Sequence, residues 1–259
     1  MIAPTFRQIL NKPLIGALIG SSLPIPYIEQ LGMVGYDYIW VDAEHGTITP
    51  TEAQCIFTAA ERRDMATLAR VPLHDSANVQ RYLDCGTQAV LFPQINSRSD
   101  AELAVQLCKF PPYGTRGLAS ARWNDYSLDP NKTLKDGIQQ VNSGNGVVIG
   151  VQIETQEAVD NAREILEVEG VDFVFLGPAD LSVSLGVPGE MGHESVKSVM
   201  RDVANIAKDV GMPVGTVLLS RQDCKEWSDM GYTVNVAIVD LMFAAGAKGL
   251  LQSMRGRKK

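Results

Sequence analysis

The chain has 259 residues, of which 45% are hydrophobic, and its 23 basic and 30 acidic residues give a formal net charge of −7 at pH 7. This length allows one complete α/β barrel, which commonly uses about 250 residues as a single domain. A net negative charge repels nucleic acid and anionic membranes, so the composition argues against partners of both kinds.

The four cysteines stand far apart and form no Cys-x-x-Cys pair. This spacing predicts neither a zinc knuckle nor a disulfide framework, and a reducing compartment fits it best. The first residues lack a long apolar core behind a basic start, and no apolar run is long enough to span a bilayer. We therefore expect a soluble cytoplasmic protein with a single domain over residues 1–259.

Apolar runs bounded by turn residues predict eight strands, and segments with helical spacing alternate with them. The strand candidates are 14–19, 37–42, 66–71, 88–92, 147–153, 171–176, 213–218 and 233–238. The helix candidates are 24–34, 50–62, 76–84, 98–108, 155–168, 194–210, 220–230 and 239–253. Strict alternation predicts a parallel sheet of the α/β class, and eight strands favour closure into a (β/α)8 TIM barrel. An open doubly wound sheet is the alternative, although no Gly-x-Gly-x-x-Gly follows the first strand.

The longest irregular stretch is 110–128, FPPYGTRGLASARWNDYSL. Its prolines and glycines argue against any regular element there. Loops of this length inside a compact domain are usually lids or binding loops, so we expect a functional role for it.

Polar side chains follow several of the predicted strands, at the point where each strand ends. They are Asp42, Glu44, His45, Arg70, Gln94, Glu154 and Asp180. Any one of them has an ordinary reading, as a helix cap or as a satisfied polar residue. Because a parallel barrel brings the carboxyl ends of its strands to one face, their convergence there predicts a functional site.

Glu154 and Asp180 follow two consecutive apolar runs and should be neighbours. Two acids with an arginine and a histidine, and no nucleophile motif, suit a hard divalent cation such as magnesium or manganese. Its open positions could take a 2-oxo acid such as pyruvate, whose enolate the cation and Arg70 would stabilise. The competing route needs a Schiff-base lysine at a strand end, and no lysine is predicted there.

The segment GPADLS at 177–182 carries a second signal, because Pro178 suits the first turn of a helix. The backbone N–H groups of Ala179 and Asp180 would then be free to bind a substrate carboxylate. An ordinary helix start with Asp180 as a cap is the competing interpretation.

Four segments closely resemble the HpcH/HpaI aldolase family, and the similarity extends over about residues 12–252. They are VDAEHGTIT (41–49), GTQAVLFPQ (86–94), FPPYGTRGLASAR (110–122) and VQIETQEAVDNAREILEVEGVDFVFLGPADLS (151–182). The resemblance implies a (β/α)8 barrel of the phosphoenolpyruvate/pyruvate superfamily. It also implies a class II, metal-dependent aldolase that cleaves a 4-hydroxy-2-oxo acid to pyruvate and an aldehyde.

The family motifs assign roles to individual residues of this chain. By resemblance, Glu154 and Asp180 bind the divalent cation, which would be Mg²⁺, Mn²⁺ or Co²⁺, and Arg70 holds the pyruvyl oxygen. His45 resembles the base that acts through a metal-bound water, with Asp84 as its orienting partner, and Asp42 would support Arg70 or His45. The remaining substrate-binding positions are Gln152, Gly177, Pro178, Ala179, Asp180 and Val217, of which Val217 would shape the aldehyde pocket.

The resemblance further implies a homohexamer built as a trimer of dimers, in which the last helix, about 239–253, packs on a neighbouring subunit. The main alternative function is oxaloacetate decarboxylation, or related decarboxylating enolate chemistry of the macrophomate synthase type. A citrate-lyase-like enzyme for coenzyme A thioesters shares the implied fold, but no additional basic loop for a nucleotide is evident. A non-catalytic scaffold would be expected to have lost Arg70, Glu154 or Asp180, and all three are present.

Overall fold

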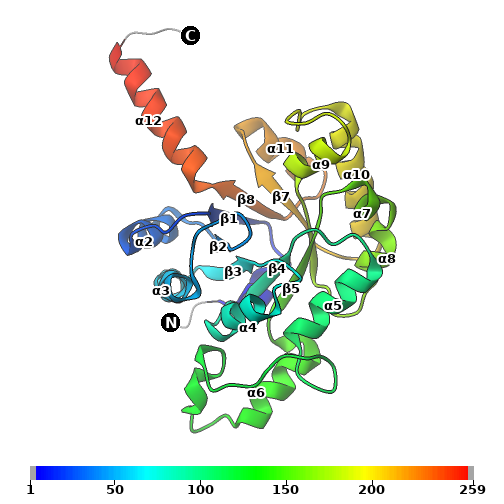
Figure 1. Cartoon of the computed structure of the whole chain (residues 1–259). Helices are drawn as coiled ribbons and strands as arrows, with labels where there is room; N and C mark the ends of the chain where they lie inside the picture. The colour runs from blue at the N-terminus through cyan, green and yellow to red at the C-terminus, as the bar shows by residue number, and fades with distance from the viewer. Residues whose placement is uncertain (1–3, 256–259) are drawn as a thin grey trace.

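A computed structural model describes residues 4–255, and its eight parallel strands close into a barrel in sequence order (Figure 1). The strands are β1 (Leu14–Ile19), β2 (Tyr38–Asp42), β3 (Ala66–Arg70), β4 (Ala89–Phe92), β5 (Val148–Ile153), β6 (Phe173–Leu176), β7 (Val214–Leu218) and β8 (Val234–Ile238). Each lies within the range expected from the sequence, so the (β/α)8 barrel is confirmed and the open sheet is wrong. The ends of the expected 1–259 domain, residues 1–3 and 256–259, lie outside the described residues.

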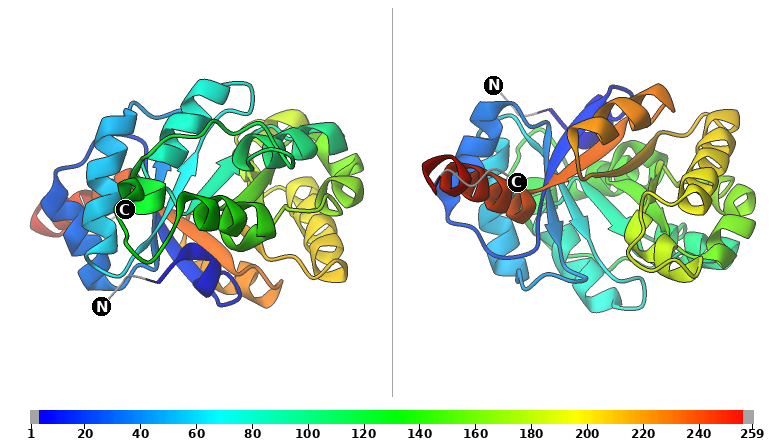
Figure 2. Two further views of the ribbon diagram at one scale, coloured as in Figure 1. Left: turned by 90° about the horizontal axis from the view of Figure 1, so that it is seen from below. Right: turned by 90° about the horizontal axis from the view of Figure 1, so that it is seen from above.

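Helices surround the strands on the outside of the barrel (Figure 2). Seven of them match predicted segments: α2 (Ile25–Val34), α3 (Pro50–Glu61), α4 (Ser76–Asp84), α5 (Arg98–Cys108), α10 (Glu194–Asp209), α11 (Arg221–Asp229) and α12 (Val239–Arg255). Side-chain caps fix several of their starts; Thr49, for example, accepts from the Glu52 amide, while the Glu52 carboxylate accepts from the Thr49 amide at 2.8 Å. The start of α9 (Pro178–Ser184) at Pro178 agrees with the expected helix start after Gly177.

The structure corrects the prediction between 155 and 168, where it has two short helices, α7 (Gln156–Asp160) and α8 (Ala162–Leu166). The chain bends at Asn161, whose side-chain amide donates to the Asn96 carbonyl oxygen at 2.8 Å. Two further helices, α1 (Phe6–Ile9) and α6 (Leu134–Gln140), were not predicted, because both are too short to show a hydrophobic period.

The segment 110–128 is also not wholly irregular, because its end forms a 3₁₀ helix, η1 (Arg122–Ser127). Within η1, Asp125 and Tyr126 have positive φ angles of 53° and 56°, so the helix is broken inside. A π-helical turn, η2 (Val141–Asn145), follows α6 before β5 begins.

Aromatic side chains fill the barrel interior, and two glycines make room for them. Gly16 pairs with Tyr38 across β1 and β2, and a Cβ at Gly16 would lie 2.2 Å from the Tyr38 ring. Gly150 pairs with Phe173 across β5 and β6, where a Cβ would again lie 2.2 Å from the ring. Phe6 of α1 packs on both rings, with centroids 5.1 Å from Tyr38 and 6.0 Å from Phe173. The side chains therefore fill the interior, which leaves the ends of the strands as the place where a site can form.

The last helix, α12, extends away from the barrel and has no buried residue (Figure 1). Phe243 and Met254 are 78% and 80% exposed, and Leu250 is 68% exposed. Within residues 4–255, no helix is both long enough and apolar enough to cross a membrane.

Candidate active site

An arginine–aspartate pair anchors the site at the carboxyl ends of β2 and β3. Asp42 and Arg70 are the last residues of these strands and lie directly opposite one another in the sheet register. Arg70 donates from Nε to Asp42 Oδ1 at 2.9 Å and from Nη2 to Asp42 Oδ2 at 2.6 Å. This two-point contact fixes the plane of the guanidinium, and both residues are buried. The structure thus brings Asp42 to Arg70, one of the two partners expected for it.

The contact with Asp42 uses Nε and Nη2 of Arg70, so Nη1 is available to other partners. Its Nη1 lies 3.1 Å from Glu44 Oε2 and 3.5 Å from Gln152 Oε1. Burial lowers the pKa of Arg70, but its contact with Asp42 and the charges of Glu44 and Glu154 outweigh this and raise the pKa above its ordinary value. Arg70 is therefore a fixed, permanently charged donor that presents Nη1 to the site.

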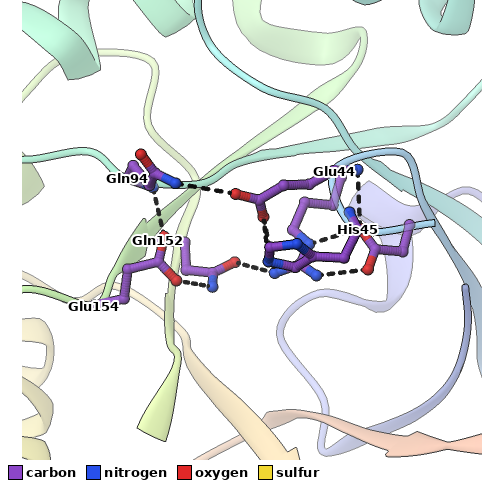
Figure 3. Close-up of polar contacts among 7 residues, drawn as sticks. Glu44, His45, Gln94, Gln152 and Glu154 are labelled. Carbon is purple, nitrogen blue, oxygen red and sulfur yellow. Dashed lines mark hydrogen bonds and ion pairs between the residues drawn. The ribbon is translucent and has the colours of Figure 1, made fainter. Parts of the chain in front are cut away.

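Glu154 lies directly after β5 and is held on both of its oxygens. Its Oε1 accepts from the backbone N–H of Gln94 at 2.8 Å, and its Oε2 accepts from the side-chain amide of Gln152. The same Gln94 donates from Nε2 to Glu44 Oε1 at 3.3 Å, so it bridges two carboxylates. Figure 3 shows these side chains converging from the strand ends, with Gln94 between Glu44 and Glu154.

The carboxyl group of Glu154 is perturbed by this environment. Burial raises its pKa to about 7, and the nearby negative charges of Asp180 and Glu44 add to the rise, while the hydrogen bonds from Gln94 and Gln152 oppose it. Asp180 is exposed in the first turn of α9. Its electrostatic effect on Glu154 agrees with the expectation that the two acids are neighbours.

A divalent cation fits this donor set. Glu154 is a buried carboxylate beside the negative charges of Asp180 and Glu44, so a positive charge would favour its ionised form. Carboxylate oxygens are also the ligands that Mg²⁺ and Mn²⁺ prefer. At Gly177 a Cβ would lie 3.0 Å from Glu154 Oε2, so glycine leaves that oxygen uncovered. No group of three His, Cys, Asp or Glu side chains suited to a metal occurs among the described residues. The two-carboxylate set of Glu154 and Asp180 would therefore leave positions for a substrate.

His45 lies at the edge of this cluster and is largely open to solvent. Its side chain is 67% exposed, and Nε2 lies 3.8 Å from Glu44 Oε2. Its backbone N–H donates to Asp42 Oδ1 at 3.3 Å, which ties the loop after β2 to the Arg70 pair. The imidazole can therefore reach a bound substrate without first leaving a buried position.

Asp84 is not brought to His45 within one chain. It is the last residue of α4, on the outside of the barrel, and its carboxylate accepts from Gln80 Nε2 at 2.9 Å. Its other oxygen lies 3.6 Å from Arg116 Nη2. The expected orienting contact is thus absent between residues 4 and 255 of a single chain.

The segment 110–128 also lies away from these residues. Arg116 sits between the rings of Phe110 and Trp123, with its guanidinium carbon 4.9 and 4.8 Å from their centroids. Trp123 lines a cavity of about 720 Å³ beside Gln88 and Val147, the residues that precede β4 and β5. The expected lid or binding loop therefore does not cover the site of its own chain.

The remaining predicted substrate positions lie together around the ends of β5, β6 and β7. Gln152 is buried in β5, Gly177 and Pro178 are buried at the start of α9, and Ala179 and Asp180 are exposed. Val217, near the end of β7, packs against the barrel-interior cluster and is half-buried. It lines a cavity that also includes Pro178.

Glu44 and Gln94 make direct contacts with Arg70 and Glu154 that their sequence positions did not predict. Both follow predicted strands, but neither was assigned a role by the motifs. The positive φ of Gln94, 56°, turns its N–H towards Glu154. A non-glycine residue in this conformation carries no mark in the sequence, so only the structure could reveal the contact.

Three comparisons place the chain among known proteins. A family model described as HpcH/HpaI aldolase/citrate lyase matches residues 22–246. A protein from Shigella sonnei (strain Ss046), named 4-hydroxy-2-oxo-heptane-1,7-dioate aldolase, is 32% identical over 95% of this chain and 92% of its own length. A hydroxypyruvate/pyruvate aldolase from Sagittula stellata is 34% identical over 75% of this chain and 74% of its own. The crystal structure of an HpcH/HpaI aldolase/citrate lyase family protein from Burkholderia cenocepacia J2315 superposes with a TM-score of 0.88 at 29% identity, covering 96% of this chain and 98% of that one.

Proposed function

The chain belongs to the HpcH/HpaI aldolase/citrate lyase family and is a carbon–carbon lyase, and we propose that it cleaves 4-hydroxy-2-oxo acids reversibly to pyruvate and an aldehyde. The Arg70 guanidinium carries the proposal, because Asp42 holds two of its nitrogens and the third faces Glu44 and Gln152 at the ends of the strands. A fixed cation beside a pair of carboxylates suits a substrate that develops negative charge on an oxygen.

In this proposal Glu154 and Asp180 hold a divalent cation. When bound, the cation supplies a Lewis acid for the 2-oxo group and offsets the negative charge of the enolate. Ionised Glu154 is needed for this role, and the Gln94 amide and the Gln152 side chain stabilise its ionised form through their hydrogen bonds.

Arg70 would donate a hydrogen bond to the oxygen of the same 2-oxo group. Because Asp42 occupies Nε and Nη2, the substrate oxygen would approach Nη1, which lies near Glu44 and Gln152. In the cleavage direction the C3–C4 bond breaks and its electron pair becomes the enolate, with charge on the C2 oxygen. Donation from Nη1 becomes stronger as that charge develops, so it lowers the barrier.

His45 would handle the proton of the C4 hydroxyl group. Cleavage requires that proton to leave as the C4 oxygen becomes the aldehyde carbonyl, and the enolate then gains a proton at C3 to give pyruvate. A histidine is suited to proton transfer near neutral pH. The short loop from Asp42 keeps the imidazole beside Glu44 and on the same face as Arg70.

We further propose that the assembled enzyme is an oligomer in which α12 packs on another copy of the chain. The helix buries none of its residues on its own barrel, and its apolar side chains Phe243, Leu250 and Met254 recur at helical spacing. A large exposed apolar surface of this kind is typical of a subunit interface. Association could also bring Asp84 or the segment 110–128 close to the site of another chain.

The proposed function is tested by following pyruvate release from several 4-hydroxy-2-oxo acids and from oxaloacetate, with Mg²⁺ or Mn²⁺ present. We expect release from at least one hydroxy-oxo acid, together with the matching aldehyde in equal amount. Pyruvate from oxaloacetate alone would replace the aldolase assignment with a decarboxylase. No pyruvate from any of these acids would overturn the proposal.

A further inference from the structure

Five polar residues at the ends of the strands form a closed ring of contacts, and Gln94 is its exposed member. One side of the ring runs through Gln152, whose Oε1 lies 3.5 Å from Arg70 Nη1 and whose amide donates to Glu154. The other side runs through Gln94, whose backbone N–H donates to Glu154 at 2.8 Å and whose Nε2 donates to Glu44 at 3.3 Å (Figure 3). Glu44 closes the ring, because its Oε2 lies 3.1 Å from Arg70 Nη1.

The backbone at Gln94 is held in a conformation that its surroundings impose. Its φ of 56° lies in the left-handed region, which residues with a side chain rarely adopt. The next N–H group, that of Ile95, donates to the Gln152 carbonyl oxygen at 3.3 Å, and both Pro93 and Ile95 are buried. Two successive N–H groups therefore join the loop after β4 to β5 and its end, and the first of them is directed at Glu154. Backbone strain that is fixed in this way is typical of functional sites.

The side chain of Gln94 holds a carboxylate that faces Arg70. The Glu44 side chain is 10% exposed, and its Oε2 accepts no hydrogen bond from the described residues. The donation from Gln94 to Oε1 therefore determines where this carboxylate lies. Its Oε2 lies beside Nη1 of Arg70, the nitrogen that we propose for the substrate oxygen. A displacement of Glu44 would change both the direction and the electrostatic surroundings of that donor.

We propose that Gln94 is a positioning residue with two separate functions. Its backbone N–H orients Glu154 for the divalent cation, and its side chain acts through Glu44 to orient Arg70 for the substrate. The inference rests on the proposed function and adds to it a residue that the family motifs left without a role. Because its amide is neutral, Gln94 can lie between the two carboxylates without repelling either of them.

Two substitutions at this position separate the two functions. Gln94→Gly removes the side chain and keeps the N–H in place, because glycine adopts a positive φ readily. Gln94→Val disturbs the backbone, because a β-branched residue at this φ is strained, and so turns the N–H away from Glu154. Electron paramagnetic resonance of Mn²⁺ added to metal-free protein measures the cation directly. We expect ~10–100-fold weaker Mn²⁺ binding by Gln94→Val, as when a hydrogen-bond partner of a metal ligand is lost, and wild-type binding by Gln94→Gly.

The function of the side chain should appear in turnover. Gln94→Gly should lower kcat for pyruvate release by ~10-fold or more and leave KM nearly unchanged, because donation from Arg70 strengthens as the enolate forms. The loss should depend on Glu44. In a Glu44→Ala background, Gln94→Gly should therefore cause no further fall in kcat. Losses from the two substitutions that simply multiply would overturn the link through Glu44.

Asp64→Gly is the matched control for the exchange of a left-handed residue for glycine. Asp64 has a φ of 58°, is exposed, and lies before β3 at the opposite end of the barrel from the site. Its replacement should leave both kcat and Mn²⁺ affinity at the wild-type values. If Gln94→Val does not fold by circular dichroism, Gln94→Ala strains the same φ with a smaller side chain and takes its place. Equal effects of Asp64→Gly and Gln94→Gly on kcat would overturn the function of the side chain.

The outcomes separate this inference from the proposed function. If the wild type releases no pyruvate from any 4-hydroxy-2-oxo acid or from oxaloacetate, the proposed function is wrong, and the Mn²⁺ affinities still decide the function of the Gln94 backbone. Wild-type Mn²⁺ binding by Gln94→Val would overturn that function. If the wild type is active and Gln94→Gly keeps its kcat, the aldolase activity stands and the function of the Gln94 side chain is wrong.

Discussion

Asp42 and Arg70 could both be placed at the ends of neighbouring strands from the sequence, because each follows a buried apolar run. The resemblance left Asp42 with two possible partners, Arg70 and His45, and the sheet register of the structure decides for Arg70. The roles of Glu44 and Gln94 could not be anticipated in this way. They depend on loop conformations, including the positive φ of Gln94, which neither composition nor periodicity encodes.

Arg70→Lys tests the geometry of this pair while keeping the charge. Lysine cannot reproduce the two-point contact with Asp42, so its ammonium would not present a fixed donor to the substrate oxygen. We expect kcat for pyruvate release to fall by ~10²–10³-fold, as when a fixed donor to a developing oxyanion is removed. A variant with nearly the wild-type kcat would show that the fixed plane of the guanidinium is unimportant.

The raised pKa of Glu154 predicts how the metal-free protein responds to pH. The folded state raises this pKa from 4.5 to about 7, so folding favours the protonated form of Glu154. The resulting contribution to the free energy of unfolding is fully present below about pH 4.5 and is lost as pH rises through 7. The loss should be on the order of 3 kcal/mol if the full difference is expressed.

Urea unfolding at pH 5 and pH 8 in the presence of EDTA measures this effect. Other groups also titrate in this range, so Glu154→Gln is the matched control, since it keeps the shape and cannot ionise. The free energy of unfolding of the wild type should fall more between these two pH values than that of the variant. Parallel behaviour of the two proteins would mean that Glu154 is not held with a raised pKa.

His45→Ala separates the two reactions that share an enolate. Only cleavage of a 4-hydroxy-2-oxo acid must move a proton at the C4 hydroxyl group, whereas decarboxylation of oxaloacetate does not. Loss of a positioned base typically costs ~10²–10⁴-fold, so cleavage should fall by that range with decarboxylation much less affected. Because the His45 side chain is largely exposed, its removal should leave the fold intact. An equal loss of both activities would contradict the assigned role.

At the level of elements, the strands were predicted well and the short helices were not. A buried parallel strand is a nearly continuous apolar run between turn residues, as in β2 and β3, where every residue is buried. Helices of four to seven residues, such as α1 and α6, are too short to show a period. The bend at Asn161 depends on a contact with Asn96, which lies far away in the sequence. Such tertiary contacts are invisible to local reasoning.

The apolar face of α12 predicts that association depends on this helix. Phe243 and Leu250 lie on one side of it, at a separation of two helical turns, and both are largely exposed. Phe243→Asp with Leu250→Asp should dissociate the oligomer, because each buried side chain of this size contributes about 1.5–3 kcal/mol.

Light scattering coupled to size-exclusion chromatography gives the mass directly. Lys248→Asp is the control, since Lys248 lies on the opposite side of α12 and should leave the mass of the wild-type assembly unchanged. A wild-type protein that is monomeric at micromolar concentration would contradict the role of α12. An oligomer that survives the double substitution would place the interface elsewhere.

The two ends of the barrel hold different kinds of side chain. Phe6 of α1 packs on the interior rings at the end where the strands begin, and the acids, Arg70 and His45 collect at the other end. The number and alternation of the elements predicted this division. The position of 110–128 was not predictable, because a loop without periodicity carries no information about the face on which it packs.

We propose that Glu154 and Asp180 hold a divalent cation on which pyruvate formation depends. The most direct measurement is pyruvate release from 4-hydroxy-2-oxoheptanoate by EDTA-treated, metal-free protein during titration with Mn²⁺, alongside Mn²⁺ binding followed by electron paramagnetic resonance. We predict that activity disappears without metal and returns in proportion to bound Mn²⁺, and that Asp180→Ala, a change at an exposed position, binds Mn²⁺ far more weakly. Full activity in the metal-free protein, or wild-type binding by Asp180→Ala, would contradict the account.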